Sequence, residues 1–201
     1  VGCQAVDLEV DIATGQVEIL KVAAAYDVGK AINPDQVRAQ LEGGLVQGMM
    51  CYHTTFTCIE AFIRQAFALA AERSVRVHAH LSEGTYEPAY CLRQYGRRPV
   101  AQYAHWGLLG PHLLASQCVQ LDTEEISLLA QHGVSVSHMP LSNCEVGGGF
   151  APVPEMLARG LRVSLGTDGY LNDMFAVMRG AFLLHKARLQ DPTVMPARTV
   201  W

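Results

Sequence analysis

The stretch Val75–Glu83, which reads Val-Arg-Val-His-Ala-His-Leu-Ser-Glu, decides the fold class of this chain. It predicts one short β-strand that delivers two imidazoles and a carboxylate. Because side chains alternate across a strand, His78 and His80 should point to the same side, and Glu83 lies just past the strand's end, where a loop begins. An isolated motif of this kind equally fits buried, hydrogen-bonded histidines and a helix-capping glutamate. The segments around it favour the functional interpretation.

The chain on both sides of this strand alternates between strand-like and helical segments. Strands are predicted at Cys51–Thr57, Val75–Leu81, Val100–Trp106, Val134–Met139 and Leu161–Leu165, and helices at Ile59–Glu72, Tyr86–Tyr95, Thr123–His132 and Val153–Arg159. Alternation at this spacing indicates βα units with parallel strands. The predicted fold class is therefore α/β, with residues 51–201 forming a partial (β/α) TIM-type barrel of about the last five βα units.

Several of the predicted strands end in residues that carry reactive chemistry. His80, His105, His138 and Asp168 lie at or near four successive strand ends, and His53 lies on the strand before them. Active sites of (β/α) barrels are built from the carboxyl ends of the strands. Four such termini therefore predict a shared site rather than isolated core residues. His78 is interpreted as structural, since most buried histidines are simply hydrogen bonded.

Residues 1–50 predict a separate, small α+β segment. Ala5–Ile12 alternates apolar and acidic residues, Gly15 suits a turn, and Val17–Ala24 alternates again, which is typical of a hairpin. Asp35–Met50 has helical spacing interrupted by glycines. We therefore expect two domains, a hairpin and helix over 1–50 and a partial barrel over 51–201.

Composition excludes several function classes. Half of the 201 residues are apolar, 17% are charged and the net charge is −4, which is typical of a packed globular protein and gives no basic surface for nucleic acid. No run approaches the ~18 apolar residues of a membrane-spanning helix. The six scattered cysteines predict reduced thiols in a cytoplasmic protein. The start at Val1, without methionine, suggests a fragment or internal segment.

Four motifs follow one another at consistent spacing in residues 51–201. They are His80–Glu83, Ala104–Leu109, His138–Asn143 and Leu165–Gly169. Together they resemble the amidohydrolase superfamily, closest to its chlorohydrolase, guanine-deaminase and cytosine-deaminase group. Three further motifs, Asn172–Phe175, Leu184–Lys186 and Asp191–Ala197, look like the SsnA-type aminohydrolases.

This resemblance implies a metal-dependent hydrolase that acts on a C–N or C–Cl bond of a small nitrogen heterocycle. By resemblance the residues divide into metal ligands (His80, Asp168, His105), catalytic residues (Glu83, His105, Asp168) and substrate-binding residues (His53, His138, Asn143). A divalent ion such as zinc or iron lowers the pKa of its bound water, and a carboxyl group near a ligand can carry the proton to the leaving amine. The family's H-x-H pair from the first barrel strand has no counterpart here. We therefore expect an incomplete barrel, acting as a homo-oligomer or with a complementing chain.

A second resemblance is confined to the first fifty residues. Tyr26–Pro34, Gln40–Gly44 and Val46–Met49 look like the molybdenum-cofactor-binding subunit of the xanthine dehydrogenase family. That resemblance implies a cofactor contact at Gln40. Fifty residues provide only one edge of a large binding surface, so we do not expect the isolated chain to hold the molybdenum cofactor. The alternative functions are thus a fragment of a molybdenum hydroxylase or a non-catalytic half-barrel.

Overall fold

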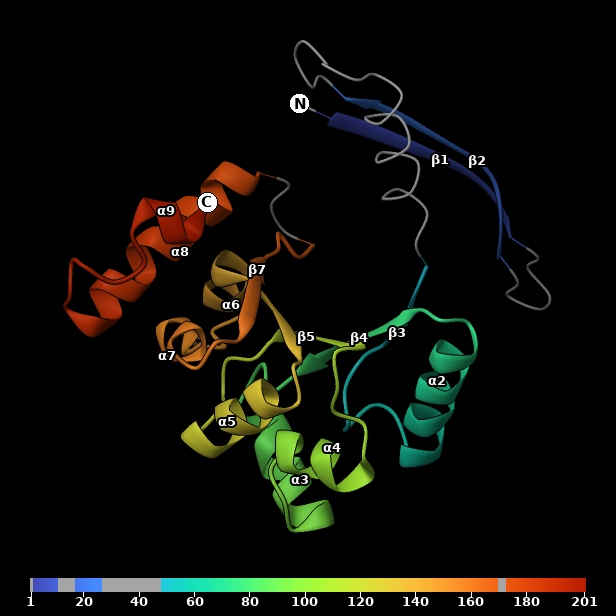
Figure 1. Cartoon of the computed structure of the whole chain (residues 1–201), viewed down its shortest axis with the longest axis horizontal. Coiled ribbons are helices and arrows are strands. Elements are labelled where there is room, and N and C mark those ends of the chain that lie inside the picture. The colour runs from blue at the N-terminus through green and yellow to red at the C-terminus, as the bar shows by residue number, and fades with distance from the viewer. Residues whose placement is uncertain (1, 11–16, 27–47, 170–172) are drawn as a thin grey trace. The chain divides into compact units, whose positions relative to one another are not determined.

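The computed structural model describes residues 2–10, 17–26, 48–169 and 173–201 (Figure 1). The chain divides into two compact units, residues 1–47 and 48–201. In the first unit, strands β1 (Gly2–Val10) and β2 (Val17–Tyr26) form an antiparallel pair in which Gly2 lies opposite Tyr26. The predicted hairpin is confirmed. Gln40 and most of the predicted 35–50 helix lie outside the described residues, and Met49 and Met50 belong to the strand that follows.

The second unit is built on a five-stranded parallel sheet whose strands follow the chain in order. They are β3 (Met49–Tyr52), β4 (Arg76–Leu81), β5 (Leu113–Gln117), β6 (Ser135–His138) and β7 (Arg162–Leu165). Each strand pairs in parallel with the next, as in successive units of a (β/α) barrel. The predicted α/β class and partial barrel are confirmed.

Helices lie between these strands along the chain, and the last two helices follow the final strand. They are α2 (Glu60–Glu72), α3 (Tyr86–Tyr95), α4 (Pro99–Trp106), α5 (Thr123–Gln131), α6 (Pro140–Glu145), α7 (Val153–Ala158), α8 (Met174–Leu189) and α9 (Ala197–Val200). Strand β4 shows why the sheet packs as it does, because Val77, Ala79 and Leu81 are buried while His78 and His80 on the alternate positions remain partly accessible. The apolar side chains of β4 pack against the helices, and its two histidines lie on the opposite, partly accessible face of the strand.

The predicted strand at Val100–Trp106 is wrong, because these residues form helix α4. Pro99 occupies the first helical turn, where its fixed φ and missing N–H are tolerated, and Gly107 ends the helix with a left-handed φ of 72°. Tyr103 and Trp106 are buried at helical spacing. The strand lies later, at β5, so His105 does not end a strand. The predicted strand at Cys51–Thr57 is also displaced, since β3 ends at Tyr52.

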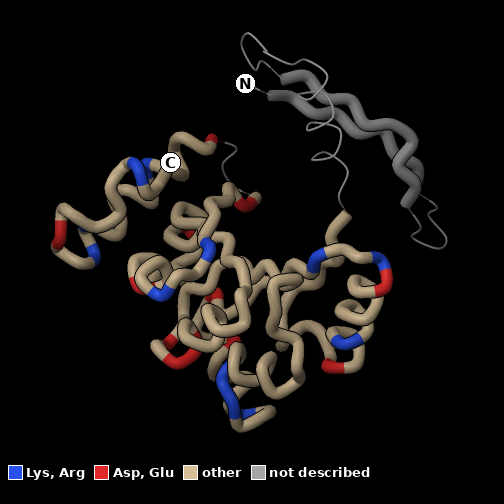
Figure 2. The backbone as a smooth tube through the Cα atoms, in the orientation of Figure 1, with Lys and Arg blue, Asp and Glu red and all other residues tan. Residues whose placement is uncertain are grey.

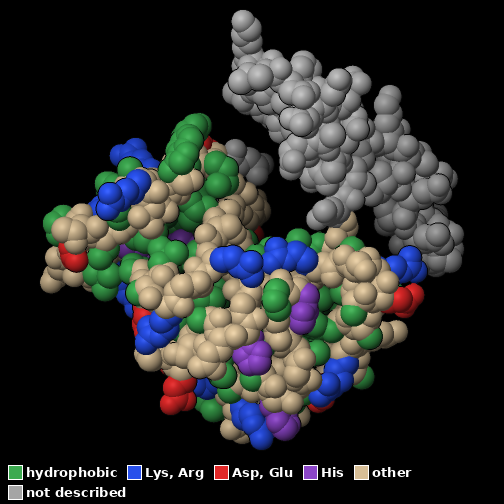
Figure 3. All heavy atoms as spheres, in the orientation of Figure 1, with side chains coloured by type: hydrophobic (Ala, Val, Ile, Leu, Met, Phe, Trp, Pro, Cys, Tyr) green, Lys and Arg blue, Asp and Glu red, His purple; other side chains and the backbone are tan. Residues whose placement is uncertain are grey.

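The described residues of the second unit include both basic and acidic side chains. Basic and acidic residues are interspersed along its backbone (Figure 2). Apolar side chains gather over α8 and α9 (Figure 3), where Phe175 and Trp201 are 74% and 87% exposed. In the described part of the chain, no helix combines the length and the apolar character needed to cross a membrane.

Candidate active site at the carboxyl ends of the strands

The carboxyl ends of the parallel strands gather most of the predicted site residues. His53 directly follows β3, His80 lies near the end of β4, Glu83 follows β4, and His138 is the last residue of β6. Asp168 comes just after β7. Because parallel strands end at the same edge of the sheet, these side chains belong to one region of the unit.

His53 and His80 form the first part of the site. Their rings lie edge to face with centroids 5.0 Å apart, and the His80 backbone N–H donates to the His53 carbonyl at 3.0 Å. The Nδ1 atom of His53 is 3.0 Å from the hydroxyl of Thr57, which fixes its ring. The Nδ1 atom of His80 is buried and has no hydrogen-bond partner. This nitrogen is open to a ligand that the protein does not itself supply.

Asp168 is held as a carboxylate by three donors. Its Oδ2 atom accepts from the Gln117 side-chain amide at 2.9 Å and from the Ser142 hydroxyl at 2.6 Å, while Oδ1 accepts from the Gly169 N–H at 2.7 Å. Burial acts to raise the pKa of Asp168, but the hydrogen bonds from Ser142 and Gln117 outweigh it. The pKa is lowered, so the group stays ionised at neutral pH, and it lies within electrostatic range of His80.

The backbone is strained at these strand ends. Ser82, Gln117, Cys118 and Asp168 all have left-handed φ values, of 53°, 73°, 51° and 58°, although none is glycine. Each such residue costs about 1–3 kcal/mol, and residues of this kind cluster at functional sites because the surroundings must hold them in place. Here Cys118 N–H donates to the Leu81 carbonyl at 3.0 Å, which ties the end of β5 to the end of β4.

Glu83 and His53 border a cleft. The cleft has a volume of about 490 Å³, within the range of small-molecule sites, and His53, Phe56, Tyr86 and Gln120 contribute to its walls. Glu83 itself is half-buried. A carboxyl group in this position can exchange protons with a ligand in the cleft.

A buried carboxyl group, Glu87, ties together the loops that carry His53 and Glu83. It accepts from the Thr55 hydroxyl at 2.6 Å and from the Ser82 N–H at 2.5 Å. Burial raises its pKa, and these hydrogen bonds oppose that change. The structural role of Glu87 was not predicted, because nothing in the sequence of α3 indicates that this glutamate is buried.

His138 at the end of β6 and Asn143 on α6 are both buried. His138 is 2% exposed, and its Nε2 atom lies 3.2 Å from Nε2 of His185 on α8. Burial lowers the pKa of His138 to about 3 and that of His185 to about 4, so both imidazoles are neutral. The His138 Nδ1 atom and both side-chain polar atoms of Asn143 are buried without hydrogen-bond partners.

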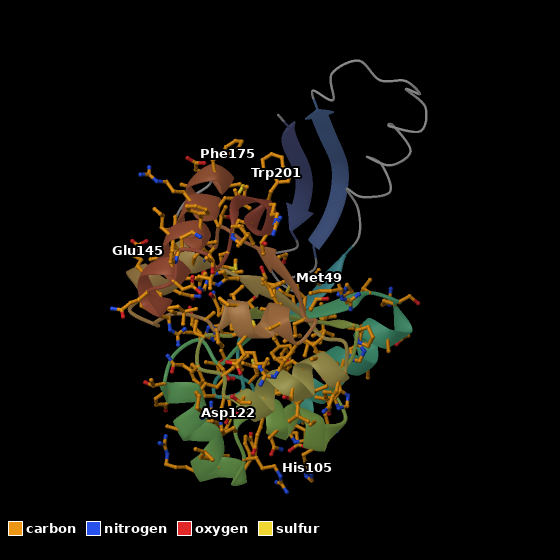
Figure 4. The ribbon with its side chains drawn as sticks, turned by 60° about the vertical axis from the view of Figure 1, so that its left-hand side comes forward. Met49, His105, Asp122, Glu145, Phe175 and Trp201 are labelled. Atoms are coloured by element: carbon orange, nitrogen blue, oxygen red, sulfur yellow. The ribbon has the colours of Figure 1, made fainter. Side chains whose placement is uncertain are left out.

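His105 is not brought to the site. It is exposed on α4, at the outer surface of the unit (Figure 4). The expectation that placed it beside His80 relied on the strand at 100–106 that the structure replaces with a helix. His78, predicted to be structural, is half-buried and hydrogen bonds to the Ser116 hydroxyl on the neighbouring strand.

Two residues that contact Asp168 were missed by the sequence interpretation. Gln117 ends β5 and Ser142 lies on α6. Gln117 was missed because the strand was predicted at 100–106. A polar residue at the end of the true strand, β5, would otherwise have been a candidate site residue. Ser142 falls within the motif His138–Asn143, but nothing in the motif indicates which of its polar residues faces Asp168.

His80 and Asp168 fit part of a divalent metal site. One offers a buried imidazole nitrogen without a partner and the other an ionised carboxylate, which are ligands that zinc accepts. Within residues 48–169 and 173–201, no group of three or more histidine, cysteine or acidic side chains converges closely enough to hold a metal. The candidate ligands among the described residues are therefore His80 and Asp168.

Comparisons with protein families and with known proteins all point to one family. Residues 21–200 match the amidohydrolase family. A 5-methylthioadenosine/S-adenosylhomocysteine deaminase from Syntrophobacter fumaroxidans is 45% identical over 152 residues, which is 74% of this chain and 35% of that protein. A 5'-deoxyadenosine deaminase from Methanothermobacter thermautotrophicus is 41% identical over 74% of this chain and 36% of that protein. The chain thus spans about a third of the length of these relatives.

Solved structures agree with this family. An adenosine deaminase from Xanthomonas campestris with bound zinc is 33% identical and superposes with a TM-score of 0.75 over 83% of this chain and 39% of its own. A guanine deaminase from C. acetobutylicum with bound guanine is 26% identical, with a TM-score of 0.66 over 71% and 36%. The comparisons do not support the xanthine-dehydrogenase-like resemblance of residues 1–50, and the family match begins inside that segment.

Proposed function

Since this chain belongs to the amidohydrolase family, we propose that it forms the metal-binding later half of a barrel that deaminates a nitrogen heterocycle. One observation carries the proposal, namely the ionised Asp168 and the unpartnered His80 nitrogen at the carboxyl edge of one parallel sheet. The relatives named as deaminases of adenosine derivatives favour an aminopurine as the heterocycle.

In this proposal His80 and Asp168 hold a zinc ion, the metal present in the related adenosine deaminase structure. A bound zinc ion lowers the pKa of water toward neutrality and so makes a nucleophile available at physiological pH. Two ligands from the described residues bind such an ion weakly compared with a closed structural site.

Glu83 is the proposed proton carrier. Its carboxyl group is half-buried at the wall of the cleft and follows the His80 ligand by three residues. It would accept a proton from the attacking water and donate one to the ring-bound amine, so that a C–O bond forms, the C–N bond breaks and ammonia leaves. His53 at the cleft wall, and the unpartnered polar atoms of His138 and Asn143, are the proposed substrate contacts. No role is proposed for His105, which is exposed on α4.

Zinc binding tests the proposal directly. Zinc affinity of the 201-residue chain is measured by competition with a chromophoric chelator, for the unmodified chain and for His80→Ala, Asp168→Ala and the exposed control His132→Ala. We expect each of the first two variants to lose at least about tenfold in affinity, because each removes one of only two ligands. The His132 variant should bind as the unmodified chain does. Equal zinc affinity in all four proteins would refute the assignment.

The reaction is tested in a completed barrel. Because the chain spans about a third of its relatives and Met49 begins the first of five parallel strands, we expect turnover only when the first three βα units of a related full-length deaminase are joined ahead of Met49. Ammonia release from adenosine derivatives and guanine is then assayed. Glu83→Gln should abolish release while retaining zinc, and the exposed Glu72→Gln should leave release unchanged. Full activity in the Glu83 variant would remove it as the proton carrier.

A further inference from the structure

The side chain of Gln117 connects the end of β5 to the carboxylate after β7. We propose that Gln117 is a positioning residue that fixes Asp168 in the orientation needed to bind the metal. The inference deepens the proposed function and rests on it, because it assumes that Asp168 is a metal ligand. It concerns a residue that touches the ligand side chain and not the metal itself.

Hydrogen bonds fix the orientation of the Asp168 carboxylate. The Gln117 Nε2 atom donates to Asp168 Oδ2 at 2.9 Å, across the space between β5 and the loop after β7. The Ser142 hydroxyl donates to the same oxygen at 2.6 Å, and the Gly169 N–H holds Oδ1 at 2.7 Å. With donors on both oxygens the carboxylate plane cannot rotate freely. Donors to a metal-ligating carboxylate orient it and are a common means by which proteins tune metal affinity.

The oxygen of the Gln117 amide is also buried. The side chain is fully buried, at 0% exposure, yet its Oε1 atom has no hydrogen-bond partner. A buried carbonyl oxygen without a donor is unfavourable for folding alone. What distinguishes Gln117 is that the nitrogen of the same amide donates to Asp168, so the hydrogen bond to the carboxylate sets the position of the buried amide.

The backbone that positions the Gln117 side chain is strained. Gln117 and Cys118 are consecutive left-handed residues, and the turn is fixed because Cys118 N–H donates to the Leu81 carbonyl and Val119 N–H to the Ser82 carbonyl, both at 3.0 Å. Residues with such strained backbones persist where the surrounding structure holds them in that conformation, and they are concentrated at functional sites. The ends of β4 and β5 thus hold Gln117 in a conformation that a plain strand-to-loop connection does not require.

The chain offers a matched control in Gln102. This glutamine is also buried, at 3% exposure, and its Oε1 atom also lacks a partner, but it lies on helix α4 and makes no hydrogen bond to Asp168. Replacing either glutamine with methionine removes a buried amide at nearly constant volume. Only the Gln117 substitution should affect the metal.

The experiment measures zinc affinity of the 201-residue chain by chelator competition for Gln117→Met, Gln117→Asn and Gln102→Met. We expect Gln117→Met to weaken zinc binding about 10- to 100-fold, the range found when an outer hydrogen-bond partner of a ligand is removed. Gln117→Asn keeps the amide and tolerates the left-handed backbone, but it is one methylene shorter and should weaken binding in the same direction. Gln102→Met should stay within about twofold of the unmodified chain.

The same substitution in an Asp168→Ala background separates positioning from a general structural effect. If Gln117 acts through Asp168, Gln117→Met should cause no further loss of zinc affinity once Asp168 is gone. An equal loss in both backgrounds, an equal loss in Gln102→Met, or unchanged affinity in both Gln117 variants would overturn the inference. If the unmodified chain binds no zinc, or His80→Ala does not weaken binding, the proposed function and this inference both fail. If the His80 result holds and the Gln117 variants bind normally, only this inference fails.

Discussion

The buried pair of His138 and His185 should make the second unit sensitive to acid. Burial lowers the pKa of His138 to about 3 and of His185 to about 4, from an ordinary value of 6.5. The folded pKa lies below the unfolded one, so the unfolded chain binds more protons as the pH falls below 6.5. The stability that the neutral pair provides is therefore complete above pH 6.5 and is lost progressively as the pH falls toward 4 and 3.

The magnitude follows from these values. For one histidine with such a shift, lowering the pH from 7 to 5 reduces the free energy of unfolding by about 2 kcal/mol. Two independent histidines would together lose about 4 kcal/mol, a large part of the stability of a domain of this size. In His185→Leu only His138 remains to titrate, so the loss between pH 7 and 5 should fall to about 2 kcal/mol. The variant should also be about 1–3 kcal/mol less stable at pH 7, because Nε2 of His138 loses its buried partner.

Urea unfolding followed by tryptophan fluorescence measures this effect. Both tryptophans, Trp106 and Trp201, lie in the second unit, and Trp106 is buried, so its emission reports on the loss of that core. His132→Gln is the matched control, since His132 is exposed and should change neither stability nor its pH dependence. The reasoning is refuted if His185→Leu loses as much stability between pH 7 and 5 as the unmodified chain.

Two further predictions concern stability. Glu87→Leu removes the acceptor of the Thr55 hydroxyl and the Ser82 N–H, so it should lower the free energy of unfolding by about 2–4 kcal/mol in urea titrations at pH 7. Asp122→Ala removes the side chain that caps α5 by accepting from Glu125 N–H at 2.9 Å, and it should cost about 1–2 kcal/mol, measured as a shift of the thermal midpoint.

Exposed neighbours provide the controls for these two changes. Glu72→Leu at the end of α2 and Glu124→Ala in the first turn of α5 should each change stability by less than about 0.5 kcal/mol. If Glu87→Leu falls in that same small range, the loops that carry His53 and Glu83 are not held by this carboxyl group. If Asp122→Ala does, α5 does not depend on its N-terminal cap.

Local sequence patterns were sufficient for most of the fold. Alternation in Val75–Leu81 and helical spacing in Tyr86–Tyr95 correspond to β4 and α3, because these periods follow from the geometry of single elements. The pattern failed at 100–106, where an apolar stretch of strand length fits either a strand or a buried helix. Pro99 before it and Gly107 after it were the local signals that favour the helix.

Sequence patterns were enough to identify the residue types available for chemistry and, through the order of βα units, to place His80 and Asp168 at strand ends on one sheet edge. Which side chains meet at that edge depends on how distant segments of the chain pack. The contact of Gln117 with Asp168 spans 51 positions and depends on a left-handed turn, and the pairing of His138 with His185 depends on how α8 packs. Such contacts are set by packing between distant segments, and neither spacing nor composition encodes them.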